Sequence, residues 1–318
     1  MHSRRVADLL RGGTSAQQLR SAGIERRAHG LYRPSSTTLP PDLERLDDAL
    51  GLMVPGTVLG GWASLRFQGN DYFDGWSSRG VRKAFVHCPP GTQLRRREMV
   101  QTFRGLIYPD EILELDGTLV STMARAAFDE ARMAPSLEEA TVVIDTAVSR
   151  VHGRPHTTMG AVGRVLDSHH KVRGIVQARA AWLLASPRVA SPWETRTRFR
   201  AVDAGVTGLL VNVPIFGPTG DLLGVVDLFD PRSGLVVESD GGHHRELERH
   251  TEDNRREERL ENHGCVVARL TVLDHRDRWG CVARLRAAHL QALARPRGTW
   301  TLETPPWWNT WEPGRPYR

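Results

Sequence analysis

The sequence predicts a mixed α/β fold of the α+β kind. Short runs rich in β-branched residues, bounded by Gly, Pro, Asp or Ser, predict strands at 222–229 and 235–240. Apolar residues at helical spacing predict helices at 42–52 and 276–293. With 318 residues, 40% of them hydrophobic and 25% charged, the chain is long enough for two or three domains with their own cores.

The N-terminal segment, residues 1–40, begins with two predicted helices at 5–11 and 14–22, the second ending before a glycine. The stretch Arg-Ala-His-Gly-Leu-Tyr that follows resembles the wing of the winged-helix domain in abortive-infection-type antitoxins, and residues up to about 180 continue the likeness loosely. The resemblance implies a winged-helix-like region that binds DNA. A recognition helix would have almost no residues between the second helix and the wing, so no base-specific contact is expected.

A basic cluster in this segment is the candidate DNA contact. Arg26, Arg27 and Arg33 are expected to touch backbone phosphates, and Arg20 and His29 lie near them in the sequence. A solvated surface explains the same residues, and both interpretations stay open.

The middle domain, residues 41–185, carries no catalytic signal. Helical spacing recurs at 136–151, and short strands are predicted at 83–87 and 115–120. Three single residues of ligand type are expected to be packed or satisfied at the surface: His87, Cys88 and His156.

Residues 186–294 are the predicted catalytic domain, which opens with a helix-start signal. Ser191 stands as the N-cap, Pro192 at the first helical position and Glu194 at the third. Glu194 has two interpretations. Its carboxylate can return to the Ser191 amide as in a capping box, or it can serve as an active-site acid facing the following hairpin.

The predicted hairpin brings acidic residues together. If its turn is a four-residue loop, Asp230 pairs with Leu235. In that register Asp227 falls directly opposite Glu238, and Asp240 follows two residues further on the same face. A five-residue loop would shift the pairing by one and separate Asp227 from Glu238.

Carboxylates opposed in this way repel, because directly opposed β-carbons lie about 4.5 to 5.5 Å apart. Solvated edge charges are one explanation. The strands that these acids interrupt are strongly apolar, however, which favours a buried site for a cation. Mg²⁺ is usually held by one or two carboxylates plus waters, so we predict that Asp227 and Glu238 bind Mg²⁺ or Mn²⁺.

Five motifs in order carry a resemblance to a nuclease family. They are Ser191-x-x-Glu194, Val226-Asp227, the run Glu-Ser-Asp-Gly-Gly-His-His at 238–244, Asp253-x-x-Arg256 and Val267-x-Arg269. This order resembles the very-short-patch-repair-like branch of the restriction-endonuclease-like PD-(D/E)XK nucleases, over about residues 190–290.

The resemblance implies a mixed central sheet flanked by helices and a metal-dependent endonuclease activity. Asp227 and Glu238 would hold the metal, with Glu194 as an accessory acid. His244 matches the family histidine that activates water or protonates the leaving oxygen, and His243 is the alternative. Histidine suits this part because its ordinary pKa is about 6.5.

One position departs from the wider superfamily. Asp240 stands where a lysine positions the attacking hydroxide, and the only two lysines of the chain, Lys83 and Lys171, lie outside this region. That role would pass to His243, His244 or an arginine, or the site would be inactive. The very-short-patch-like branch, by resemblance, also manages without the lysine, which favours an active site. Asp240 is a candidate catalytic residue that would support the metal.

The remainder of this domain is expected to be scaffold. A charged helix is predicted at 251–263, a strand at 265–270 and a closing helix at 276–293. Arg269, near the end of that strand, is a candidate phosphate contact, with a structural salt bridge as the alternative.

The tail, residues 295–318, is rich in Trp and Pro. Its rings could stack on unpaired bases. We expect the commoner outcome, a strap that buries the rings on its own domain.

Composition limits the class of protein. The net charge of +6 and an isoelectric point near 9.8 favour a polyanionic partner such as DNA. Three widely spaced cysteines predict buried, reduced thiols. No apolar leader and no run of 18 apolar residues is present, which predicts a cytoplasmic protein without a membrane span.

Together these patterns predict a Mg²⁺-dependent endodeoxyribonuclease, a hydrolase that cuts or nicks DNA. The alternative is a non-catalytic, antitoxin-like or regulatory DNA-binding protein that keeps a degenerate nuclease fold. The sequence carries no signal for the oligomeric state.

Overall fold

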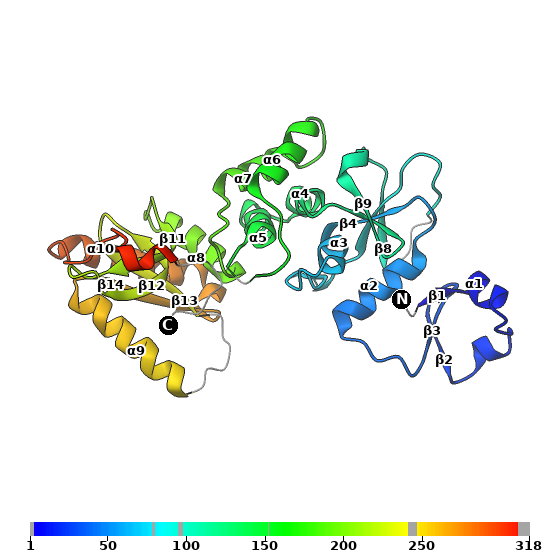
Figure 1. Ribbon diagram of the computed structural model, residues 1–318, viewed down its shortest axis with the longest axis horizontal. Coiled ribbons are helices and arrows are strands. Elements are labelled where there is room, and N and C mark those ends of the chain that lie inside the picture. The colour runs from blue at the N-terminus through cyan, green and yellow to red at the C-terminus, as the bar shows by residue number, and fades with distance from the viewer. Residues whose placement is uncertain (1–2, 78–79, 95–97, 152, 241–246, 311–318) are drawn as a thin grey trace. The chain divides into compact units, whose positions relative to one another are not determined.

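The computed structural model describes residues 3–77, 80–94, 98–151, 153–240 and 247–310 (Figure 1). Its contacts divide the chain into two compact units. The first unit comprises Met1–Pro135 and Arg154–Trp182, and the second comprises Ser136–Gly153 and Leu183–Arg318. Helices occur with mixed sheets in both units, which confirms the mixed α/β class.

Two compositional expectations can be compared with the structure. The three cysteines are buried and form no disulfide, as expected. Among the described residues, none of the helices combines the length and the apolar character needed to cross a bilayer.

The N-terminal part of the first unit is a three-stranded sheet in the order β1–β3–β2, with a short helix. Its elements are β1 (Arg4–Arg5), α1 (Val6–Arg11), η1 (Gln18–Arg20), β2 (Ile24–Ala28) and β3 (Leu31–Pro34). The second helix expected at 14–22 is wrong, because only the single 3₁₀ turn η1 forms there. The side chains of Ser15 and Gln18 accept hydrogen bonds from each other's backbone amides, the capping-box pattern that starts a helix, but the helical turn ends at Arg20.

Ion pairs attach one face of this sheet to α2 (Pro41–Leu52). Arg27 donates to Asp48, with Nη2 2.9 Å from Oδ2. Arg33 is only 3% exposed and bonds Glu44. This sheet face is therefore an internal surface of the first unit.

A five-stranded mixed sheet in the order β8–β7–β4–β10–β9 forms the centre of the first unit. The strands are β4 (Val58–Gly60), β7 (Ala84–His87), β8 (Val100–Phe103), β9 (Ile112–Leu115) and β10 (Thr118–Ser121). The other elements are α3 (Gly61–Phe67), β5 (Trp76–Ser77), β6 (Gly80–Val81), η2 (Pro109–Glu111), α4 (Met123–Met133), α6 (Met159–Ser168) and α7 (Ile175–Leu184). The strand expected at 83–87 is confirmed as β7. The strand expected at 115–120 matches β10 only from Thr118, because Leu115 ends β9 and residues 116–117 form the turn between the two strands.

A network of buried ionisable side chains involves α4. Its members are His87, Glu111, Arg125, Asp129, Arg132 and His169. Arg125 is central, since its Nε donates to Asp129 at 2.8 Å and its Nη1 contacts both Glu111 and His169. Burial, together with the charges of Arg125 and Arg132, lowers the pKa of His87. The expectation that His87 is a packed core residue is confirmed.

A four-stranded mixed sheet in the order β11–β12–β13–β14 forms the centre of the second unit. Its strands are β11 (Leu210–Phe216), β12 (Leu222–Asp230), β13 (Leu235–Asp240) and β14 (Val266–Thr271). β12 is antiparallel to β11 and β13, while β14 runs parallel to β13. Asp230 pairs with Leu235, so the register predicted from a four-residue turn is confirmed at that turn.

Helices cover both faces of this sheet (Figure 1). They are α8 (Pro192–Asp203), α9 (Leu247–Asn262) and α10 (Arg278–Ala294). The unit also contains α5 (Leu137–Val148), which packs on α8, and the short turns η3 (Asp274–Arg276) and η4 (Pro306–Thr310). On the α8/α10 face, Leu285 lies in one apolar core with Val237. On the α9 face, Leu260 lies in a second core with Val236. The predicted central sheet flanked by helices is confirmed.

The helix α5 belongs to this second unit, although the sequence analysis placed it in the middle domain. The buried Asp145 of α5 accepts from Thr195 Oγ1 at 2.7 Å and from Arg198 Nη2 at 2.9 Å. Glu138 pairs with both terminal nitrogens of Arg200, at 2.8 and 2.7 Å. Polar contacts therefore attach α5 to α8, the helix that carries Glu194.

The described part of the tail, up to Thr310, forms a strap on the α9 face that buries Trp300 but leaves Trp307 54% exposed, so the expected burial of the rings is confirmed for Trp300 and wrong for Trp307. Trp300 is 7% exposed and packs edge-on against Phe229, with ring centroids 4.8 Å apart. Thr301 forms a β-bridge with Phe216, and the Trp307 ring packs against Phe216. The tail thus covers part of the second apolar core and pairs with β11.

Candidate active site

The candidate site lies where β12 and β13 separate. Their ladder runs from the turn to the pair Leu228 and Val237. Past that pair, β12 continues beside β11 and β13 continues beside β14. The predicted pairing of Asp227 with Glu238 is not part of this ladder, because the two acids are the first residues of β12 and β13 beyond its last pair.

Asp227 is half-buried, and its carboxylate reaches towards β13. Oδ2 accepts a hydrogen bond from the Ser239 backbone N–H at 2.7 Å. The Ser239 hydroxyl in turn donates to Thr197 Oγ1 on α8 at 2.7 Å. Thr197 Oγ1 also lies 3.1 Å from His275 Nε2. Ser239 therefore links the Asp227 carboxylate to the N-terminal half of α8.

Glu194 is held at the start of α8 by three hydrogen bonds. Ser191 is the N-cap as predicted, since its Oγ accepts from the Glu194 N–H at 3.3 Å. The Glu194 carboxylate accepts from the Ala190 N–H at 2.9 Å and from Asn212 Nδ2 at 2.6 Å, both at Oε2. The Glu194 carboxylate therefore binds the backbone amide of Ala190, one residue before the predicted Ser191 amide. The Asn212 side chain on β11 binds the same carboxylate oxygen.

Glu194 and Asp227 form an interacting pair of acids. Burial, and next the negative charge of Asp227, raise the pKa of Glu194 to about 8. At neutral pH the Glu194 carboxyl therefore keeps its proton. Among the predicted site residues whose side chains are described, Glu194 and Asp227 are the two acids that interact with each other.

We expect Glu194→Gln to stabilise the second unit more at pH 9 than at pH 5. The pKa of Glu194 is raised from 4.5 to about 8 by folding, so the folded state binds more protons than the unfolded state between these values. The free energy of unfolding therefore falls as pH rises through this interval. Glutamine removes that loss, which is on the order of 3 kcal/mol.

Calorimetric unfolding of the full chain at both pH values measures this difference. Glu258→Gln, at an exposed position on α9, is the matched control and should show no such pH dependence. A stability change of equal size at pH 5 and pH 9 would contradict the expectation.

Glu238 is buried on the α9 face. Its Oε2 lies 3.4 Å from Nη2 of Arg256, a residue of α9 whose Nη1 donates to the Val225 carbonyl at 3.0 Å. Arg269 stands beside Glu238 in the parallel ladder and pairs with Glu257 at 2.7 Å. Arg269 thus forms a salt bridge, and its phosphate contact stays a prediction.

The remaining predicted residues lie beyond the described side chains. His243 and His244 fall outside the described residues, and of Asp240 only the backbone is described, as the last residue of β13. Within the part that is described, no group of three or more His, Cys, Asp or Glu side chains is placed to hold a metal ion.

Several residues in contact with the candidate acids, or with their neighbours, were not predicted from the sequence. Asn212 stands out in the sequence only as the one amide in an apolar strand. No sequence pattern indicates Thr197, Ser239 and His275, because their contacts join residues 42 and 78 positions apart.

The N-terminal arginines have different surroundings. Arg27 and Arg33 form ion pairs with carboxylates of α2, so their guanidinium groups hold the sheet against that helix. Arg33 is buried, so the structure does not support the phosphate contact expected for it. Arg26 is exposed and pairs in register with Tyr32, which pairs on its other side with the exposed Arg4. These three residues form a row across the sheet that we call the outer row.

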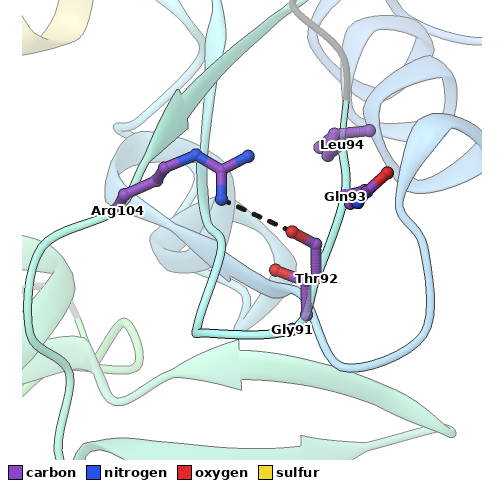
Figure 2. A pocket seen from close by; sticks show the side chains of 5 residues that line it. All are labelled: Gly91, Thr92, Gln93, Leu94 and Arg104. Carbon is purple, nitrogen blue, oxygen red and sulfur yellow. Dashed lines mark hydrogen bonds between the residues drawn. The ribbon is translucent and has the colours of Figure 1, made fainter.

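A cavity of about 480 Å³ in the first unit is lined by residues 91–94 and Arg104. Figure 2 shows the Arg104 side chain donating to the Thr92 carbonyl, at 3.4 Å. Its lining has no carboxylate or imidazole, so it offers none of the groups that the predicted chemistry requires.

The fold and the site define a mixed α/β protein with an interacting pair of acids, one buried and one half-buried, at the divergence of two antiparallel strands. Comparisons with models of protein families, with curated proteins and with solved structures find no match for this chain.

Proposed function

We propose that the second unit is a metal-dependent DNA endonuclease. The observation that carries this proposal is the interacting pair of the buried Glu194 and the half-buried Asp227, placed where β12 and β13 separate, with Glu238 as the first β13 residue beyond their ladder. Perturbed acids at the end of a strand pair are typical of catalytic sites. Their order along the chain is that of the very-short-patch-repair-like nucleases.

Carboxylate oxygens are the ligands that a hard divalent cation such as Mg²⁺ or Mn²⁺ takes. Burial, and next the negative charge of Asp227, raise the pKa of Glu194, and a cation would relieve the repulsion between these two acids. The three acids do not surround one point, because no group of three such side chains is found among the described residues. Two carboxylates suffice for Mg²⁺, which keeps several waters. Asp227 and Glu238 would hold the ion, and the ion would supply charge that polarises a phosphodiester.

The chain's own residues would do the remaining work. Glu194, protonated at neutral pH, and His243 or His244 would carry protons to and from the reacting groups. The Ser239 amide keeps the Asp227 carboxylate at the divergence of the strands.

Charge supports DNA as the substrate. The chain carries a net charge of +6, and arginine supplies nearly all of its cations. The outer row of the first unit sets a Tyr ring between two exposed Arg side chains, which suits contact with phosphates and bases.

One observation favours a second candidate function, a DNA-binding protein that does not cut. Arg256 lies 3.4 Å from Glu238 and neutralises part of its charge, as an internal cation would in a degenerate nuclease site. Such a protein would keep the outer row and bind DNA in a salt-dependent way without needing a metal.

The deciding experiment incubates the purified full chain with supercoiled plasmid, with Mg²⁺, with Mn²⁺ and with a chelator. We expect nicked or linear product only when a divalent ion is present. Intact DNA in every reaction, extended to nicked, mismatched and single-stranded substrates, would overturn the nuclease proposal and favour the second candidate.

A further inference from the structure

Asn212 has a backbone conformation that its place in the fold does not explain. Its φ is +45°, in the left-handed region that L-residues rarely adopt. Asp116, the other described non-glycine residue with positive φ, lies in the two-residue turn between β9 and β10, where this conformation is normal. Asn212 lies inside the seven-residue strand β11, where no turn requires it. Strain of this kind is often retained for a functional reason.

The strained residue stands opposite Asp227. The register is the same on both sides of it, with Val211 paired to Leu228 and Val213 paired to Val226. Residues two apart on a strand normally share a face. Here Val211 and Leu228 lie in the core of the α8/α10 face, whereas Val213 and Val226 lie in the core of the α9 face.

Both strands therefore exchange faces at the position of Asn212 and Asp227. The regular alternation of side chains between the two faces, on which the predicted site depends, is therefore interrupted at this point. The Asp227 side chain belongs to neither regular face. The Asp227 carboxylate instead reaches the Ser239 N–H on β13.

The Asn212 side chain contacts the other acid. Its Nδ2 donates to Glu194 Oε2 at 2.6 Å and to the Arg188 carbonyl at 2.7 Å. One residue thus acts on both members of the acid pair, on Asp227 through its backbone and on Glu194 through its amide.

We propose that Asn212 is the positioning residue of this site: its left-handed backbone turns Asp227 towards Ser239, and its amide holds Glu194 beside Asp227. This inference rests on the proposed function for its catalytic meaning, while its geometry can be tested without a metal or DNA.

Two substitutions separate the roles of the backbone and the amide. Asn212→Val disfavours positive φ, since a β-branched side chain tolerates that region poorly. We expect the Ser239 amide to exchange with deuterium at least about tenfold faster in this variant, because the bond to Asp227 is lost. Asn212→Gly permits positive φ and removes only the amide, so Ser239 exchange should stay as in the wild type.

The amide role is measured on Asn212→Gly. We expect its affinity for Mn²⁺, followed by calorimetric titration, and its cleavage rate to fall about 10- to 100-fold, as for other residues that orient metal-site groups. In the Glu194→Ala background, which lacks the acceptor, the same change should have a smaller effect on cleavage and thermal unfolding than in the wild type, because only the Asn212 bond to the Arg188 carbonyl is left to lose. Asp116→Val is the matched backbone control and should leave Ser239 exchange and Mn²⁺ affinity unchanged.

Unchanged Ser239 exchange in Asn212→Val would overturn the backbone role. Additive effects of Asn212→Gly and Glu194→Ala on unfolding would overturn the amide role. A wild-type chain that neither binds Mn²⁺ nor cuts DNA would end the proposed function, yet Ser239 exchange and the unfolding cycle would still decide the role of Asn212.

Discussion

Asp227→Asn is expected to abolish metal-dependent DNA cleavage while leaving DNA binding intact. Asparagine has the same shape and its side-chain oxygen can still accept from the Ser239 N–H, so the strands should keep their arrangement. The substitution removes the negative charge that would hold the cation beside the substrate. Metal ions contribute several kcal/mol to such reactions, so cleavage should fall at least about 100-fold.

Plasmid nicking with Mg²⁺ and a salt-dependent filter-binding assay measure the two properties. Asp221→Asn is the matched control, because Asp221 is an exposed acid directly before β12 that bonds Thr219. Wild-type cleavage by Asp227→Asn would remove Asp227 from the site. Loss of DNA binding without loss of folding would instead place Asp227 at the contact with DNA.

Arg125→Met is expected to destabilise the first unit by about 3–5 kcal/mol. Arg125 is 1% exposed and contacts Asp129, Glu111 and His169, so its loss leaves buried acids without their central cation. Breaking a buried ion pair by removing one partner costs on this scale, because the remaining charge stays desolvated.

Differential scanning calorimetry of the full chain should show a lower transition for the first unit and an unchanged transition for the second. Arg154→Met provides the control, since Arg154 pairs with Asp71 at the surface and should cost less than about 1 kcal/mol. An unshifted first transition in Arg125→Met would show that the network contributes little to stability. Arg125→Lys, which keeps the charge, should recover part of the loss.

The sequence predicted the elements whose signals are local. Ser191 caps α8 because its hydroxyl accepts a hydrogen bond from the backbone N–H of Glu194, only three residues further on. The pairing of Asp230 with Leu235 follows from the four residues of the turn between them. By contrast, the prediction of a helix at 14–22 is wrong in its length. Ser15 and Gln18 form the capping box that starts a helix, but only one 3₁₀ turn follows, because a helix this short depends on tertiary packing for its stability.

Local sequence patterns were enough to predict the mixed α/β class, the hairpin with its turn, and Glu194, Asp227 and Glu238 as candidate acids. Three contacts could be seen only in the folded chain: α5 packs on α8, Arg33 is buried against Glu44, and Asn212 contacts Glu194. The two groups differ in the distance along the chain between the interacting residues. Caps, turns and periodic faces depend on residues a few positions apart, whereas the surroundings of a carboxylate depend on which distant segments pack against it.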